Sequence, residues 1–183
     1  MDIAARQHGE GVTPKLFEPI QLGGLTLSNR IVIAPMCQYS GVDGQMTDWH
    51  LIHLGHLALS GAAALTIEAT AVEPEGRITY ADTGLWNDAT EAAMARTIES
   101  IRRWSDIPLV IQLAHAGRKA STDVPWEGGE QFPPGHKHGW QTVAPSPIPF
   151  ESGEHPPRAL DRTALEHIRE SFAASARRAA RLG

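Results

Sequence analysis

The sequence predicts an α/β fold built from three successive strand–helix units. Three apolar segments, residues 31–34, 62–69 and 108–115, have the length of buried strands, and a segment with helix signals follows each of them along the chain. Alternation of this kind implies parallel strands joined by right-handed crossovers. At 183 residues the chain is too short for a complete eight-stranded α/β barrel, which typically takes about 250 residues.

The N-terminal region precedes the first of these units. Residues 1–15 are polar and are expected to form a flexible leader, so the domain is expected to cover residues 16–183. Gly23 and Gly24 separate the short stretches 20–22 and 25–27, which predicts a β-hairpin with a two-residue turn.

Three helices are expected, over residues 47–60, 88–104 and 161–182. Thr47 is a suitable N-cap for the first helix, and Gly61 follows its end. Asp88 begins the second helix, and either Asp161 or Thr163 caps the third. Residues 117–160 hold most of the prolines and form a long irregular excursion after the third strand. The excursion is too long to serve only as a connection between two elements.

Composition excludes several classes of protein. The chain has 16 Lys and Arg against 21 Asp and Glu, and this net charge of −5 argues against a nucleic-acid binder. No apolar run approaches the roughly 20 residues of a membrane helix, and the N-terminus lacks the apolar core of a secretory signal. A single cysteine, Cys37, excludes an internal disulfide and a Cys-rich zinc site. Together these features predict a cytoplasmic protein.

The residues that follow each strand carry the candidate chemistry, because parallel α/β folds bind ligands at the carboxyl ends of their strands. Cys37 and Tyr39 follow the first strand, residues 68–71 end the second, and Gln112 and His115 end the third. A thiol, a phenol, a carboxamide and an imidazole are therefore expected on one edge of the sheet. Neither a GxGxxG fingerprint nor a phosphate-binding P-loop occurs in the sequence.

Four segments resemble the Old Yellow Enzyme family of FMN-dependent oxidoreductases. They are Asn29 to Tyr39, Glu68 to Ile78, Ile111 to Lys119, and the short Ala144-Pro145-Ser146. They follow the order of the family's first strand, second strand and loop, third strand and subsequent excursion, so that the resemblance covers residues 16–183. The cysteine and the tyrosine two residues later are typical of the thermophilic-like subclass, which includes the xenobiotic reductases.

The resemblance implies a fold and a reaction. The fold would be the N-terminal part of a TIM (β/α)8 barrel, with about three βα units after the hairpin. NADPH or NADH would reduce FMN, which would pass hydride to an activated C=C bond such as that of an enone. The implied partners are a small α,β-unsaturated substrate and, at full length, further copies of the same chain; no metal, nucleic acid or membrane is implied.

The resemblance also assigns roles to individual residues. Cys37 would tune the flavin and contact substrate, and Tyr39 would contact substrate from the rim. The residues implied to contact FMN are Ala34, Pro35, Met36, Cys37, Ala69 and Gln112.

Each of these residues also has a plain structural interpretation. Cys37 is a small hydrophobe if buried, Tyr39 an amphipathic surface side chain, Ala69 ordinary packing, and Gln112 a satisfied polar group. His50, His53 and His56 are interpreted as solvated or helix-packing residues rather than metal ligands. Trp126 and Trp140 are expected to anchor the excursion rather than wall a pocket. The arginines of the last helix are expected to be a solvated face, namely Arg169, Arg177, Arg178 and Arg181.

The family pattern continues beyond the segments found here. Its fourth strand carries a His-x-x-His-Gly-Tyr motif with the proton-donating tyrosine, and the chain ends at Gly183, before that strand. We therefore expect an N-terminal portion of an ene reductase that binds FMN weakly by itself. The alternative is a non-catalytic half-barrel that needs another chain or self-association.

Overall fold

The computed structural model describes residues 14–133 and 135–183. The predicted leader, residues 1–15, therefore lies almost wholly outside the described residues. The first described elements are a short 3-10 turn at Lys15–Phe17 and the predicted hairpin, in which β1 (Ile20–Leu22) pairs antiparallel with β2 (Leu25–Leu27). Gly23 has a φ of +57° in the turn, a conformation that favours glycine.

A parallel sheet of three strands forms the centre of the fold. Its order is β3 (Val32–Ile33), β4 (Ala64–Ala71) and β5 (Leu109–Ala114). The three predicted strands are confirmed with shifted ends. β3 has only two ladder residues, and Pro35, which has no N–H to donate, follows close behind it. β4 runs two residues past the predicted end because it stays paired with β5 as far as Ala114.

Helices α1 (Asp48–Ala58), α2 (Asp88–Arg102) and α3 (Arg162–Leu182) complete the three units. Thr47 and Asp161 are the N-caps of α1 and α3, and the Asp161 carboxylate accepts a hydrogen bond from the Ala164 N–H at 2.8 Å. α1 and α2 each end two residues before the predicted position. In α2 the reason is a tightened last turn, in which the Trp104 N–H donates to the Ile101 carbonyl.

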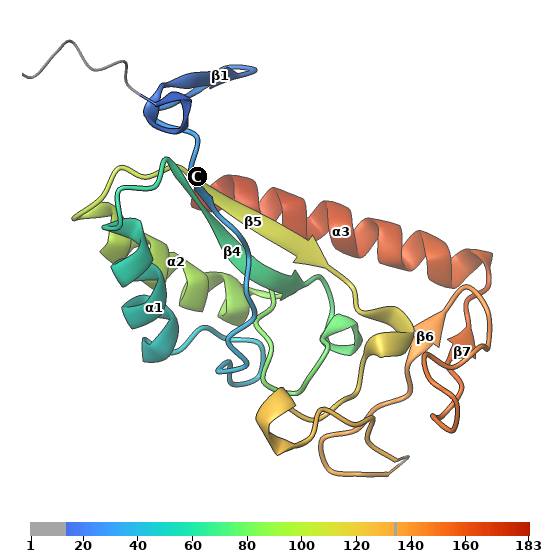
Figure 1. Cartoon of the computed structure of the whole chain (residues 1–183). Coiled ribbons are helices and arrows are strands. Elements are labelled where there is room, and N and C mark those ends of the chain that lie inside the picture. The colour runs from blue at the N-terminus through green and yellow to red at the C-terminus, as the bar shows by residue number, and fades with distance from the viewer. Residues whose placement is uncertain (1–13, 134) are drawn as a thin grey trace, which may run out of the picture.

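The helices cover one face of the sheet and leave the other open (Figure 1). Leu54 of α1, Leu65 and Ile67 of β4, and Met94 and Ile98 of α2 form the buried core between these layers. On the opposite face Val32 and Val110 remain 49% and 46% exposed.

One arginine of α3, Arg178, corrects the expectation of a solvated face, whereas Arg181 stays 57% exposed. Arg178 forms ion pairs with Asp88 at 2.8 Å and with Glu91, and its side chain is only 18% exposed. Arg181 binds the same Glu91 carboxylate at 2.7 Å. These contacts join α3 to the first turn of α2.

The excursion lies beyond the carboxyl ends of β4 and β5, whereas the hairpin lies beyond their amino ends (Figure 1). The excursion contains 3-10 turns at Gly117–Lys119 and Pro125–Glu127, and a small parallel ladder between β6 (Val143–Ala144) and β7 (Arg158–Ala159). The sequence did not predict this ladder, since strands of two residues leave no detectable alternation.

Candidate functional site

The open face of the sheet brings together three of the predicted site residues. Ala69 of β4 is the register partner of Gln112 of β5. Ala34 follows β3 and alternates with the core-facing Ile33, so it shares the open face with Val32. The result is a surface with two small side chains and one exposed carboxamide. No hydrogen bond of the Gln112 side chain occurs within residues 14–133 and 135–183.

A β-bulge in β4 decides which residue faces Gln112. Ile67 pairs with Ile111 and Ala69 pairs with Gln112, so Glu68 is an extra residue in the strand. Strict alternation would place Glu68 on the same face as Thr66. Instead Ile67 and Glu68 are both buried, and the partly exposed positions are Thr66 and Ala69. The bulge thus removes a carboxylate from the open face and substitutes a methyl group.

Cys37 lies against this part of β4 and is half-buried. The Ala69 N–H and the Tyr39 hydroxyl both lie within hydrogen-bond reach of its thiol, and these contacts lower its pKa. Burial raises the pKa more strongly, the charges of Asp82 and Glu68 add to that effect, and the net pKa is about 11. Cys37 is therefore a neutral thiol near pH 7. It is suited to polarizable contact with a ligand and poorly suited to nucleophilic attack.

Tyr39 adopts a left-handed backbone conformation, with a φ of +47°. Burial first, and then the neighbouring Cys37, raise the pKa of its phenol to about 12, so that the hydroxyl keeps its proton. The ring meets Trp126 edge to face, with centroids 5.9 Å apart. Tyr39 also lines a cavity of about 650 Å³, together with Lys119 and Thr122.

Glu68 and His50 form a buried pair on the helix side of β4. Their side chains are 3% and 0% exposed, and His50 Nε2 lies 3.4 Å from Glu68 Oε1. The other carboxylate oxygen of Glu68 accepts a hydrogen bond from the Gln38 N–H at 2.8 Å. Sequence reasoning did not assign either residue to the site. The signal that marks Glu68 is a charged residue inside an otherwise uncharged strand.

The three histidines of α1 have different surroundings. His50 is buried as described, His53 stacks on Trp49 with centroids 6.3 Å apart, and His56 is exposed. Within the described part of the chain no group of three or more His, Cys, Asp or Glu side chains is arranged to hold a metal ion.

Asp82 is a second buried carboxylate near Cys37. It accepts hydrogen bonds from the Ile78 N–H at 2.7 Å and from the Thr79 hydroxyl at 2.8 Å. Burial raises its pKa although these hydrogen bonds oppose the shift. Asp82 thus orders the turn that carries residues 78–82 past the thiol.

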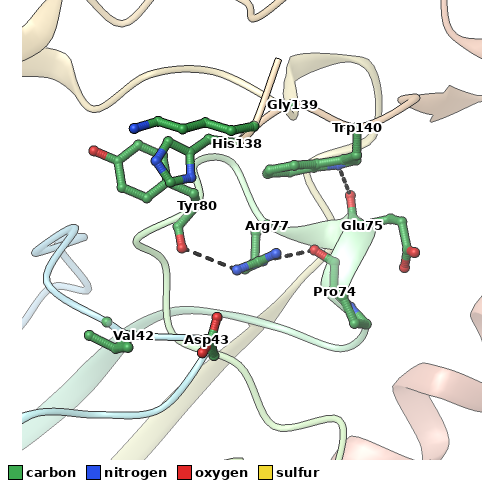
Figure 2. A pocket seen from close by; sticks show the side chains of 11 residues that line it. Val42, Asp43, Pro74, Glu75, Arg77, Tyr80, His138, Gly139 and Trp140 are labelled. Carbon is green, nitrogen blue, oxygen red and sulfur yellow. Dashed lines mark hydrogen bonds between the residues drawn. The ribbon is translucent and has the colours of Figure 1, made fainter. Parts of the chain in front are cut away.

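Arg77 ties the β4–α2 loop to the excursion at the edge of a cavity of about 450 Å³ (Figure 2). Its guanidinium lies 5.5 Å from the ring centre of Trp86 and 5.2 Å from that of Trp140, and it donates hydrogen bonds to the Pro74 and Tyr80 carbonyls. The Trp140 indole N–H donates to the Glu75 carbonyl at 3.0 Å. These contacts make Trp140 an anchor of the excursion, as expected, but its side chain also lines the cavity, which was not expected.

His115 has a structural partner. Its Nε2 lies 2.9 Å from a carboxylate oxygen of Glu73, and the Gly117 N–H donates to its Nδ1 at 3.0 Å. The second oxygen of Glu73 accepts a hydrogen bond from the Ser171 hydroxyl of α3 at 3.1 Å. This contact fastens the end of β5 to α3.

The structure gathers Ala34, Ala69 and Gln112 on the open face, with Cys37 and Tyr39 beside them. Pro35 and Met36 connect Ala34 to Cys37, and the Met36 side chain is 71% exposed.

Within the described part of the chain no helix is long and apolar enough to cross a membrane.

Comparison with known proteins identifies relatives over most of the chain. An NADH:flavin oxidoreductase of Gibberella zeae is 42% identical over 172 residues, which are 92% of this chain and 41% of that protein. An NADPH dehydrogenase of Bacillus cytotoxicus is 37% identical over 92% of this chain and 44% of its own length. The chain therefore spans less than half the length of these curated relatives.

Solved structures agree with the fold. Morphinone reductase in complex with tetrahydroNAD is 30% identical, with a TM-score of 0.75 over 93% of this chain and 47% of that one. An Old Yellow Enzyme from a Pichia species is 21% identical with a TM-score of 0.74 over 90% of this chain and 42% of that one, and it supports the fold alone. The three βα units are thus part of a (β/α)8 barrel, as predicted.

The match to a family model extends over nearly all of the described residues. The model of the NADH:flavin oxidoreductase / NADH oxidase family matches residues 15–183. It includes every residue that forms the open face, the Cys37 loop and the excursion. The chain belongs to the NADH:flavin oxidoreductase / NADH oxidase family.

Proposed function

We propose that this chain contributes one wall of the active site of an FMN-dependent NAD(P)H oxidoreductase of the ene reductase type. The observation that carries the proposal is the pairing of Ala69 with Gln112 on the open face, directly beside the Cys37 thiol. The relatives named NADPH dehydrogenase and NADH:flavin oxidoreductase support the assignment, as does the tetrahydroNAD bound to morphinone reductase.

The open face fits a flat, weakly polar ring system. Ala34 and Ala69 present only methyl groups, so a planar ligand can approach the strands closely. The exposed Gln112 carboxamide offers both a donor and an acceptor, which matches the pyrimidine edge of a flavin. FMN, when bound, supplies the hydride chemistry.

The proposed contributions of Cys37 and Tyr39 depend on their protons. Cys37 stays a thiol and gives a polarizable, uncharged contact beside the ring. Tyr39 stays a phenol at the rim of the 650 Å³ cavity, where its hydroxyl is suited to donate a hydrogen bond to a carbonyl oxygen. The proposed acceptor is accordingly a small α,β-unsaturated carbonyl compound, such as an enone. The thermophilic-like subclass is proposed on the same Cys37 and Tyr39 pattern.

The proposed location is the cytoplasm, on the sequence ground of a single cysteine, which leaves no internal disulfide. The proposed assembly of the full-length enzyme is a homo-oligomer.

Titration of the chain with FMN, followed by flavin fluorescence, tests the cofactor assignment. Gln112→Leu is expected to weaken binding about tenfold, because each lost hydrogen bond costs about 0.5–1.5 kcal/mol. Gln21→Leu, the same change on the exposed hairpin strand β1, is the matched control and is expected to bind as the unmodified chain does. FMN is also expected to slow alkylation of Cys37, the only cysteine. Equal affinities for the two variants, or an unprotected thiol at saturating FMN, would refute the assignment.

Weak binding is expected for this chain alone, because the residues proposed above contact only one side of the ring. Purification with tightly bound, stoichiometric FMN and NADPH oxidation would contradict that expectation.

A second candidate is a non-catalytic half-barrel that associates with another chain or with itself. The exposed Val32 and Val110 on the open face favour it, since burial of such side chains drives association. Light scattering separates the two candidates, because a monomer that binds FMN supports the first and an FMN-free dimer the second.

A further inference from the structure

The loop that carries Cys37 and Tyr39 is held at its centre by a buried carboxylate. Glu68 Oε2 accepts the Gln38 N–H at 2.8 Å, and Gln38 is the residue between the thiol and the phenol. Glu68 is the extra residue of the bulge, and paired residues on either side restrain its backbone. The hydrogen bond is charge-assisted and partly buried, which makes it one of the stronger kinds.

His50 lies beside the other oxygen of the same carboxylate. Its Nδ1 accepts the Thr47 N–H at 3.0 Å, so the neutral ring carries its proton on Nε2. That nitrogen lies 3.4 Å from Glu68 Oε1, and neither atom has a hydrogen-bond partner among the described residues. The Thr47 hydroxyl in turn donates to the Ser40 carbonyl at 2.9 Å. The first turn of α1 therefore places an imidazole N–H 3.4 Å from the carboxylate and holds the far end of the loop by a hydrogen bond.

A second contact holds the Gln38 side chain at the surface. The Trp49 indole N–H donates to the Gln38 Oε1 at 3.1 Å, and Trp49 is 48% exposed. This exposed hydrogen bond joins two uncharged groups and involves only the side chain of Gln38, whereas Glu68 binds the Gln38 backbone.

We propose that His50 and Glu68 are a positioning pair, in which α1 orients the Glu68 carboxylate and Glu68 fixes the Gln38 backbone so that Cys37 and Tyr39 face Ala69 and the open face. The pair acts through the loop, and neither residue contacts the ligand surface itself. The inference rests on the proposed function, because that function gives Cys37 and Tyr39 their roles.

Charges around the thiol provide a readout that does not need FMN. Asp82 and Glu68 are the carboxylates that raise the pKa of Cys37, and Tyr39 is the titratable donor beside it. On the helix side, Glu68 is faced by His50 and lies near His53. Removal of the Glu68 charge is therefore expected to lower the pKa of Cys37, whereas removal of the Gln38 contact is expected to release the loop.

The test compares Glu68→Gln, Glu68→Ala and the control Trp49→Phe in the full 183-residue chain without FMN. Two quantities are measured: hydrogen exchange of the Gln38 amide, and the rate of Cys37 alkylation by iodoacetamide against pH. Glu68→Gln keeps an acceptor for Gln38, so its amide is expected to stay protected while the alkylation profile moves to lower pH. A lower pKa raises the thiolate fraction near pH 8, so the alkylation rate there is expected to rise.

In Glu68→Ala the Gln38 amide is expected to lose its protection from exchange, and the pH profile of Cys37 alkylation is expected to change. In Trp49→Phe both quantities are expected to stay as in the unmodified chain. An unchanged Gln38 exchange rate in Glu68→Ala, or an unchanged alkylation profile in Glu68→Gln, would overturn the inference. If Glu68→Ala does not fold, Glu68→Met, which has nearly the same shape but no oxygen to accept from Gln38, takes its place, and an unchanged Gln38 exchange rate in it would overturn the inference. Failure of FMN to bind while these results hold would refute the proposed function and leave the positioning pair in place.

Discussion

Gly44→Ala is expected to destabilise the protein because Trp86 occupies the space that a Cβ would need. A Cβ on Gly44 would lie 2.1 Å from the Trp86 ring, and Gly44 has a φ of +76°. The left-handed conformation costs about 1–2 kcal/mol for a residue with a side chain. Overpacking adds about 1–3 kcal/mol. The expected loss is therefore about 2–5 kcal/mol in the free energy of unfolding, a large share of the roughly 5–15 kcal/mol typical of a whole domain.

Urea denaturation followed by circular dichroism measures this loss. Gly55→Ala is the matched control, because Gly55 lies within α1 and a Cβ there would meet nothing within 4 Å. Alanine in place of a helical glycine is expected to stabilise by about 0.5–1 kcal/mol, so the two variants should move in opposite directions. A loss below about 1 kcal/mol for Gly44→Ala, or equal changes in both variants, would refute the argument that the ring is tightly held.

Three further predictions follow from burial and charge. The Cys37 thiol is expected to titrate near pH 11 in the folded chain but near its ordinary pKa of 9.0 in urea, as read from thiolate absorbance. Its contribution to stability is then present below pH 9 and lost as the pH rises to 11; a folded-state midpoint at 9 would contradict this. Asp82→Asn is expected to move that midpoint down, because the Asp82 charge raises the pKa of the thiol; an unmoved midpoint would count against it. Leu65→Ala, at a fully buried position, is expected to cost about 2–5 kcal/mol in urea denaturation. Val32→Ala on the open face is expected to lower the free energy of unfolding clearly less. Equal losses in the two variants would contradict the assignment of Leu65 to the core and of Val32 to the open face.

The strands and helices were predictable because their signals are local. The apolar segments that became β4 and β5 are long enough to show burial from sequence, and Thr47 and Asp161 carry recognisable caps. The predicted ends of the helices and strands were wrong by one or two residues. A tightened last turn set the end of α2, and continued pairing with β5 set the end of β4. The ladder of β6 and β7 depends on two segments that meet only after the excursion folds back, so no local pattern encodes it.

The candidate site was predictable where a motif placed a residue at the end of a strand. Cys37, Tyr39, Ala69 and Gln112 do come together, although their roles toward a ligand remain predictions. Glu68 was not assigned because alternation alone gives no sign of an extra residue in a strand. The ion pairs of Arg178 were missed for a similar reason, since their partners are on a helix about 90 residues away.

The extra residue in β4 shifts the alternation of side chains between the two faces of the strand, so that even-numbered and odd-numbered positions change roles. Before Glu68 an even-numbered residue, Thr66, is on the open face, and after it an odd-numbered one, Ala69, takes that place. Deletion of residue 68 would therefore restore regular alternation and keep Ala69 on the open face, whereas a regular strand that retained Glu68 would exchange the two faces of everything that follows it. A mutational scan that assumed one parity throughout would assign Glu68 to the ligand and Ala69 to the core, the reverse of their positions.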